Sequence, residues 1–276
     1  MAVLFVCGTP IGNLEDVSIR LLKTLRQVDL IACEDTRHTI KLLNRYKIKK
    51  RLVSYHEHST QEKEDFLIEQ LLTGKSIALV TDAGMPSISD PGELLVKRAI
   101  IENIRIEVIP GPSALIAALS ISGLDSTSFI FAGFLPVRSG KRRQSLQQYL
   151  TETRTVILYE APHRLLATLV DIEAVLGFDR KLVIVRELTK KFEEVKRGRA
   201  EELKEYFGVN PPRGEICLLI AGVEKSNEPP DIQVITEEVK ELMRSGMDKK
   251  EALKNKAREY QIKKAILYKY FVENDN

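Results

Sequence analysis

Residues 77–92, IALVTDAGMPSISDPG, join an apolar run to a loop rich in glycine, proline, serine and aspartate. The run Ile77–Thr81 has mainly apolar side chains on both faces, which is typical of a strand buried inside a parallel sheet. Similar runs predict further strands at Val3–Cys7, Leu30–Cys33, Leu52–Ser54 and Ile106–Ile109. Helical apolar periodicity predicts helices between them, at Val17–Gln27, Thr39–Tyr46, Gln61–Leu72, Gly92–Glu102 and Ser113–Ser122. This alternation predicts an α/β domain over residues 1–123, with a parallel sheet covered on both faces.

A second pattern follows Leu124 and predicts a mixed α/β domain over residues 124–225. Its strand candidates are Ser128–Phe134, Thr155–Tyr159, Leu182–Glu187, Glu193–Arg197 and Glu215–Ala221. Its helices are expected near Lys141–Leu150, His163–Val175 and Ala200–Phe207. A short polar link joins the third and fourth strand candidates, which predicts a hairpin and hence antiparallel pairing in this sheet.

The end of the chain is predicted to form a separate helical module. Residues 226–231 belong to the stretch EKSNEPPD, whose composition is typical of a linker. In the module 232–276, Asp248 and Glu251 form a capping-box pattern, and a turn near Tyr260–Gln261 leads to a last helix. The residues predicted to share one face of that helix are Ile262, Ile266, Leu267 and Tyr270. Helix, short turn and helix at this scale resemble a helix-turn-helix.

The composition is that of an ordinary globular protein, 43% hydrophobic and 29% charged over 276 residues. The 42 Lys+Arg against 39 Asp+Glu give a net charge of +3, which is too small to indicate nucleic acid binding by itself. Three widely spaced cysteines without a CxxC pair favour a reducing compartment. The N-terminus lacks the pattern of a signal peptide, and the longest uncharged stretch, 108–124, is broken by proline and glycine. We therefore expect a cytoplasmic protein without a membrane segment.

Four loops rich in glycine and proline follow predicted strands, at 8–13, 81–92, 110–114 and 133–136. Ligands of open α/β sheets bind outside the carboxyl ends of the strands, so these loops predict a binding pocket. Neither GxGxxG nor GxxxxGK[ST] occurs, which leaves dinucleotide and nucleoside triphosphate sites without support. His56 and His58 flank Glu57 without a third ligand nearby, so a polar loop is expected there rather than a metal site.

Several motifs together resemble the tetrapyrrole methylase superfamily. They are VCGTPIGNLED (6–16), CEDTR (33–37), SYHEH (54–58), VTDAGMPSISDPG (80–92), PGPSA (110–114), GFLP (133–136), YEAPHR (159–164) and RELTK (186–190). Within the superfamily, the chain is similar to the members that methylate the 2′-hydroxyl of a cytidine in small-subunit ribosomal RNA. The resemblance runs from Val3 to about Val223 and continues into the helical tail.

The resemblance implies that S-adenosylmethionine is the methyl donor and that it binds in the cleft between two α/β domains. It also implies 16S rRNA as the substrate, at the decoding region of the small ribosomal subunit, and a homodimer. The donor-binding residues that it implies are Pro10, Asp82, Ala83, Gly84, Pro86, Ser113, Ala114, Tyr159, Leu188 and Gly214. The groups at 82–86 would present backbone atoms to the methionine end of the donor.

A ribose hydroxyl is a poor nucleophile until its proton is accepted, so one general base is expected and no metal. The candidates are Glu160 and His163 in YEAPHR, Glu34 and Asp35 in CEDTR, and Glu187 in RELTK. Arg37 and Lys190 would bind phosphate or orient the ribose. The alternative for this region is structural, because Arg164 and Arg186 could simply pair with Glu160 and Glu187.

Two basic segments are candidates for RNA contact, 138–154 and 249–269. The residues assigned to RNA binding, besides Arg37, are Arg142, Arg143, Lys249, Lys250, Lys263 and Lys264. A solvated helix face is the alternative for the tail. A methylase of a corrin-like small molecule would explain the donor loops but not the basic tail. A non-catalytic RNA-binding protein would explain the tail but not the donor loops.

Overall fold

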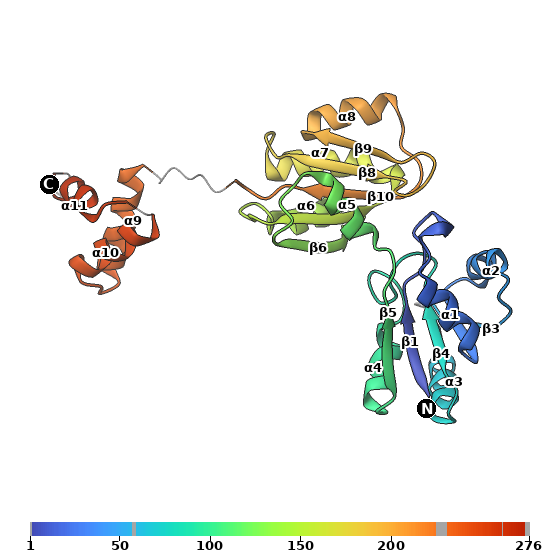
Figure 1. The fold of residues 1–276 in the computed structure, drawn as a ribbon. Helices are drawn as coiled ribbons and strands as arrows, with labels where there is room; N and C mark the ends of the chain where they lie inside the picture. The colour runs from blue at the N-terminus through green and yellow to red at the C-terminus, as the bar shows by residue number, and fades with distance from the viewer. Residues whose placement is uncertain (1, 57–58, 225–230, 261, 274–276) are drawn as a thin grey trace. The chain divides into compact units, whose positions relative to one another are not determined.

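The computed structural model describes residues 2–56, 59–224, 231–260 and 262–273. They belong to two compact units, Met1–Val223 and Glu224–Asn276, each with its own hydrophobic core. The predicted linker 226–231 lies almost entirely outside the described residues. The first unit contains two five-stranded sheets (Figure 1).

The first sheet is parallel throughout and has the strand order β3-β2-β4-β1-β5. Its strands are β1 (Val3–Cys7), β2 (Leu30–Cys33), β3 (Arg51–Ser54), β4 (Ile77–Val80) and β5 (Arg105–Ile109). The helices of this part are η1 (Leu14–Asp16), α1 (Ile19–Gln27), α2 (Thr36–Arg45), α3 (Gln61–Leu72) and α4 (Glu93–Ile101). The predicted strands and helices are confirmed, with shifts of a few residues at their ends.

Period-two alternation along the strands sends apolar side chains to both faces of this sheet. Ile31 packs in a cluster with Leu21 and Leu25 of α1. Its chain neighbour Leu30 packs in the opposite cluster, which includes Leu67 of α3. Polar side chains start two of the helices, because Ser18 caps α1 and Asp35 caps α2 by accepting hydrogen bonds from backbone N–H groups. Local capping and two-sided burial therefore agree on a covered parallel sheet.

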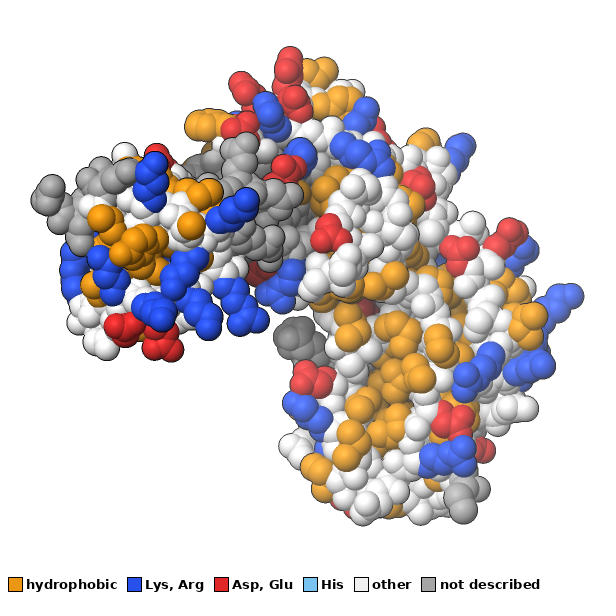
Figure 2. Space-filling view, turned by 60° about the vertical axis from the view of Figure 1, so that its left-hand side comes forward, with side chains coloured by type: hydrophobic (Ala, Val, Ile, Leu, Met, Phe, Trp, Pro, Cys, Tyr) orange, Lys and Arg blue, Asp and Glu red, His pale blue; other side chains and the backbone are white. Residues whose placement is uncertain are grey.

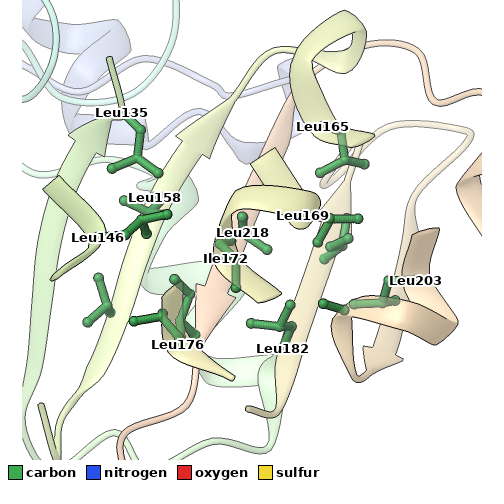
Figure 3. Packing of buried hydrophobic residues seen from close by; sticks show 14 of the residues in the cluster. Leu135, Leu146, Leu158, Leu165, Leu169, Ile172, Leu176, Leu182, Leu203 and Leu218 are labelled. Carbon is green, nitrogen blue, oxygen red and sulfur yellow. The ribbon is translucent and has the colours of Figure 1, made fainter. Parts of the chain in front are cut away.

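The second sheet is mixed and has the order β6-β7-β10-β8-β9. Its strands are β6 (Phe129–Phe134), β7 (Thr155–Glu160), β8 (Leu182–Arg186), β9 (Glu194–Gly198) and β10 (Ile216–Ile220). The pair β6–β7 is parallel, and β7–β10, β10–β8 and β8–β9 are antiparallel, which confirms the predicted hairpin. One face is covered by α6 (Ser139–Gln147), α7 (Leu165–Leu176) and α8 (Ala200–Val209), whose leucines and isoleucine pack on the strands (Figure 3). A short helix, η2 (Pro162–Arg164), precedes α7.

The other face of the second sheet is covered by α5 (Ala114–Ser122), which the sequence assigns to the first domain. Leu115 and Leu119 of α5 pack against Ile157 and Val183 of the second sheet. The change from one sheet to the other therefore falls at 110–113, about ten residues before the predicted boundary at Gly123. The sequence pattern does not say which sheet α5 covers, because this helix is apolar all round.

The C-terminal unit contains α9 (Ile232–Arg244), α10 (Lys249–Glu259) and α11 (Lys264–Glu273), packed around Ile235, Val239 and Leu253. Asp248 caps α10 by accepting from the N–H groups of Lys250 and Glu251, as its pattern predicts. The buried residues of α11 are Leu267 and Phe271, whereas Ile266 is exposed. Ile266 therefore does not lie on the same face as the buried Leu267, contrary to the prediction that the two share a face. No helix among the described residues combines the length and the apolar character needed to cross a bilayer.

Candidate active site

A cavity of about 390 Å³ opens in the first unit, within the usual range for small-molecule sites. It is lined by loops that follow β4, β5, β7 and β8 and by the start of β10. Its lining residues include Ile11, 83–85, 88–90, Ser113, Ala114, Phe134, 159–162, Val185, Leu188 and 214–217. The predicted pocket at the strand ends is therefore present, and both sheets contribute to it.

Two glycines allow the loops after β1 and β5 to touch backbone to backbone. A Cβ atom on Gly111 would lie 2.6 Å from the carbonyl oxygen of Gly8, which only a residue without a side chain tolerates. Next to this contact, Thr9 and Gly84 exchange two backbone hydrogen bonds of 2.9 and 3.1 Å. These contacts hold together the Gly/Pro loops 8–13, 81–92 and 110–114, which follow three strands of the N-terminal sheet.

Seven of the ten residues assigned to donor binding line the cavity: Ala83, Gly84, Ser113, Ala114, Tyr159, Leu188 and Gly214. The other three, Pro10, Asp82 and Pro86, are not among the lining residues. The N–H and the carbonyl of Gly84 both bond the backbone of Thr9. Gly84 has φ +80°, so it is required for the turn itself.

Asp82 and Glu34 form a polar cluster beside the cavity. The carboxylate of Asp82 accepts from the N–H of Asp35 at 3.1 Å and lies 2.7 Å from Nδ1 of His38. Burial raises the pKa of the Glu34 carboxyl above its ordinary value. The hydrogen bond from the N–H of Asp82 opposes this shift, and the negative charge of Asp82 adds to it. Arg37 is exposed and forms an ion pair of 2.7 Å with Asp35. The backbone N–H of Asp35 in CEDTR and the side chain of His38 just after it therefore hold Asp82 in the loop 81–84.

Glu160 is buried and its carboxylate is fully bonded. It accepts from the N–H of Ala161 at 2.8 Å and from the hydroxyl of Thr168 at 2.5 Å, and pairs with Arg164 at 3.2 Å. Arg164 also donates to the carbonyl of Leu135, so the pair fastens YEAPHR to the GFLP loop. These contacts match the structural alternative for Glu160 and Arg164. His163 is exposed and is not among the lining residues.

Lys190 lies at the rim of the cavity between two carboxylates. Its Nζ is 2.8 Å from Glu187 and 3.0 Å from the lining residue Glu215. Burial alone would lower the pKa of Lys190, but the two carboxylates outweigh it and hold the pKa above its ordinary value. Lys190 therefore stays protonated near neutral pH. A Cβ atom on Gly12 would lie 2.6 Å from the Lys190 chain, so the loops after β1 and β8 are in contact.

Asp90 is a lining residue that the sequence motif contains but that was not assigned a role. Burial, with the nearby charges of Glu34, Asp82 and Glu215, raises the pKa of Asp90 to about 7. The only sequence signal was its place in a Gly/Pro/Ser loop after a strand, and this signal does not distinguish Asp90 from Asp82.

The structure contradicts the assignment of Arg142 to RNA binding. The Arg142 side chain is 4% exposed, and its guanidinium bonds the buried carboxylate of Asp171 at 2.6 and 2.7 Å. A further bond of 3.0 Å to the carbonyl of Val137 holds the GFLP loop. Arg143 bonds the same carboxylate, but half of its side chain is exposed. The basic cluster seen in the sequence is therefore partly an internal ion-pair network.

No group of three or more His, Cys, Asp or Glu side chains is arranged to hold a metal ion in the part of the chain that the structure describes. His58 and Glu57 lie outside that part. The basic tail residues assigned to RNA belong to the C-terminal unit, whereas the residues that line the cavity belong to the first unit; the tail residues are Lys249, Lys250, Lys263 and Lys264.

Comparison with known proteins gives the family. A family model described as Tetrapyrrole (Corrin/Porphyrin) Methylases matches residues 3–204. A protein of Synechocystis sp. named ribosomal RNA small subunit methyltransferase I is 45% identical over 274 residues, 99% of this chain and 98% of that protein. The chain belongs to the ribosomal RNA small subunit methyltransferase I family. The family member from Thermotoga maritima is 47% identical over 224 residues, 81% of this chain and 100% of that protein.

A solved structure shares the fold of this methyltransferase family member. The uroporphyrin-III C-methyltransferase of Thermus thermophilus, in complex with S-adenosylhomocysteine, has a TM-score of 0.56 and 17% identity. The match covers 80% of this chain and 97% of that one. At 17% identity the likeness concerns the fold alone. This fold agrees with the predicted arrangement of two α/β domains.

Proposed function

We propose that this chain transfers a methyl group from S-adenosylmethionine to the ribose 2′-hydroxyl of a cytidine in the decoding region of 16S rRNA. The observation that carries the proposal is the strand-end cavity in a chain 45% identical, over almost its full length, to a protein named for methylation of small-subunit rRNA. The small ribosomal subunit, rather than free RNA, is the proposed setting, in the cytoplasm.

The residues around the cavity fit this donor by charge. The N-terminus of α5 opens at Ser113 and Ala114, where no side chain caps the helix, so a carboxylate is favoured there. Glu215 supplies negative charge for an ammonium or sulfonium group. The apolar side chains of Ile11 and Leu188 suit an adenine ring.

The bound donor would supply a methyl carbon on a positively charged sulfur, which is a good leaving group. The residues of this chain would then position the ribose and accept one proton. Among the sites first assigned to catalysis, Glu160 is proposed to hold the loop 159–164 in place, and Lys190 to fix the rim through Glu187 and Glu215. Glu34 and His163 were candidates for the general base, and here they are proposed as contacts of the substrate.

RNA would enter past an aromatic rim. Phe134 is exposed beside the cavity and lies against Tyr159, with 5.7 Å between ring centroids. An exposed ring on a loop held by Arg142 and Arg164 offers a stacking surface for an unpaired base. Arg37 and Arg143 are exposed enough to meet phosphate.

The helical C-terminal unit is proposed to add affinity for RNA. Figure 2 shows Lys and Arg side chains gathered on one face of the C-terminal unit. The lysines assigned to RNA there are Lys249, Lys250, Lys263 and Lys264. The Thermotoga maritima family member, with 224 aligned residues, is about as long as the first unit alone. The tail is therefore proposed to strengthen binding without being required for the reaction.

Removing residues 225–276 is expected to leave donor affinity unchanged and to weaken RNA binding, with a smaller dependence of RNA affinity on salt. Each lost phosphate contact lowers the slope of log K against log salt by about 0.7–0.9. Titrations of small subunits at three salt concentrations, with the full chain and the shortened chain, check this. Equal affinities and slopes would show that the lysines are only a solvated face.

A homodimer is also proposed. Helix α4 and the edge strand β5 expose apolar side chains, namely Leu94, Ile100, Ile101 and Val108. Figure 2, which brings the α4–β5 side forward, shows apolar side chains gathered on that face of the N-terminal sheet. Exposed apolar surface of this kind is typical of a contact between subunits.

The molecule that accepts the methyl group distinguishes the proposed function from methylation of a macrocycle. Methyl transfer from labelled S-adenosylmethionine is compared for isolated small ribosomal subunits and for a tetrapyrrole under the same conditions. Incorporation into the subunits alone is expected. Incorporation into the tetrapyrrole alone would replace the proposal, and donor binding without transfer to either would contradict it.

A further inference from the structure

The carboxylate of Asp90 differs from the other acidic groups at the cavity because it has no bonding partner among the described residues. Glu160 is bonded on both oxygens, Asp82 is held by Asp35 and His38, and Glu215 is paired with Lys190. Asp90 has neither a hydrogen bond nor an ion pair with any residue in the described ranges, although it is half-buried and lines the cavity. A polar group taken from water without a partner costs stability, so its retention indicates a task.

The loop that carries Asp90 is strained and tightly held. Ser87 and Ser89 both have left-handed backbone conformations, with φ of 70° and 59°. Such backbone conformations are strained for residues other than glycine and collect at functional sites. The N–H of Ser87 donates to the carbonyl of Pro91 at 3.3 Å, and a Cβ atom on Gly92 would lie 2.9 Å from the Ser87 hydroxyl oxygen. The turn 87–92 therefore fixes where the Asp90 carboxylate lies.

We propose that Asp90 is the general base that accepts the proton of the ribose 2′-hydroxyl. This inference rests on the function proposed above. As the ribose oxygen forms its bond to the methyl carbon, the carbon–sulfur bond breaks and sulfur keeps the electron pair. The hydroxyl proton passes to Asp90 and leaves to water when the product departs. Charge and atoms balance without a metal or a second reactant.

The groups around Asp90 shift its pKa toward neutral pH, where a general base works best. The charged groups that face it are Glu34, Asp82 with its partner His38, and Glu215 with its partner Lys190, together with the phenol of Tyr159. Burial and the three carboxylates raise the pKa of Asp90 to about 7. A base with a pKa near the working pH is partly ionised and still a strong proton acceptor.

The test is Asp90→Asn, with Asp16→Asn at the exposed end of the short helix η1 as the matched control. With small ribosomal subunits, Asp90→Asn is expected to slow single-turnover methylation by about 10²–10⁴-fold, while donor affinity changes by less than about threefold. Asp16→Asn is expected to match the wild-type chain. An unchanged rate in Asp90→Asn would overturn the inference. A parallel loss of donor affinity would show that Asp90 binds the donor instead.

The pH profile tests the inference without a variant. In the wild-type chain, kcat/KM for the donor is expected to rise tenfold per pH unit below about 7 and to level off above it. A profile that is flat from pH 5.5 to 8.5 would contradict the role. A wild-type chain that binds the donor but methylates no subunit would overturn both this inference and the proposed function. Wild-type methylation with an unaffected Asp90→Asn variant would overturn this inference alone.

Thermal unfolding gives a readout that is independent of activity. An aspartate ionises near pH 3.9 in the unfolded chain and near 7 when folded, so rising pH favours unfolding between about pH 4 and 7. Asp90→Asn removes this penalty. Its Tm is expected to exceed that of the wild type at pH 8, with the difference shrinking toward pH 4. A Tm at pH 8 equal to or below that of the wild type would contradict an unpaired, buried carboxylate at this position.

Discussion

Ser113→Phe is expected to lower the affinity for S-adenosylmethionine by at least about 100-fold, or about 2.7 kcal/mol, while the protein stays folded. Ser113 lines the cavity at the start of α5. Its side chain makes no capping hydrogen bond, so the substitution removes no contact that supports the helix. The phenylalanine ring would occupy space in a cavity of about 390 Å³ that the donor needs.

Ser120→Phe is the matched control, because it makes the same change near the other end of the same helix. Ser120 is exposed and its hydroxyl bonds only the carbonyl of Ala117 in its own helix. Calorimetric titration with S-adenosylmethionine is expected to give wild-type affinity for this control. Wild-type affinity in a folded Ser113→Phe variant would place the donor elsewhere.

Arg142→Ala is expected to lower the free energy of unfolding by about 3–5 kcal/mol. The substitution leaves the Asp171 carboxylate buried at 2% exposure without its most enclosed partner. It also removes the bond from Arg142 to the carbonyl of Val137, which supports the GFLP loop. Urea unfolding followed by circular dichroism measures the change.

Arg143→Ala is the control for Arg142→Ala, because Arg143 bonds the same Asp171 carboxylate from a half-exposed position. A loss of less than about 1 kcal/mol is expected there. If Arg142→Ala keeps wild-type stability and instead weakens RNA binding, the buried ion pair is not the role of this residue.

The architecture follows closely from sequence pattern. β1 and β2 have the predicted ends, because runs that are apolar on both faces and bounded by turn residues have few other solutions. The hairpin of β8 and β9 follows from a link too short for a crossover. The exception is α5, whose all-round apolar surface fits either sheet, so its partner is decided by tertiary packing.

The site was predicted less well than the fold, for physical reasons. The motifs locate the loops, but a sequence does not say which carboxylate keeps its oxygens free. Glu160 ends one apolar strand and Asp90 lies in the loop after another, yet Glu160 is bonded on both oxygens and Asp90 lines the cavity unpaired among the described residues. Arg142 looked like a phosphate contact because its partner, Asp171, is distant in sequence.

The chemical position of the transferred methyl group tests the central claim most directly. Small ribosomal subunits that lack the modification are incubated with the chain and methyl-labelled S-adenosylmethionine, and the RNA is digested to nucleosides for mass spectrometry. The account predicts label in 2′-O-methylcytidine from one site in the decoding region of 16S rRNA. Label on a base, on another nucleoside or only on a tetrapyrrole acceptor would contradict it.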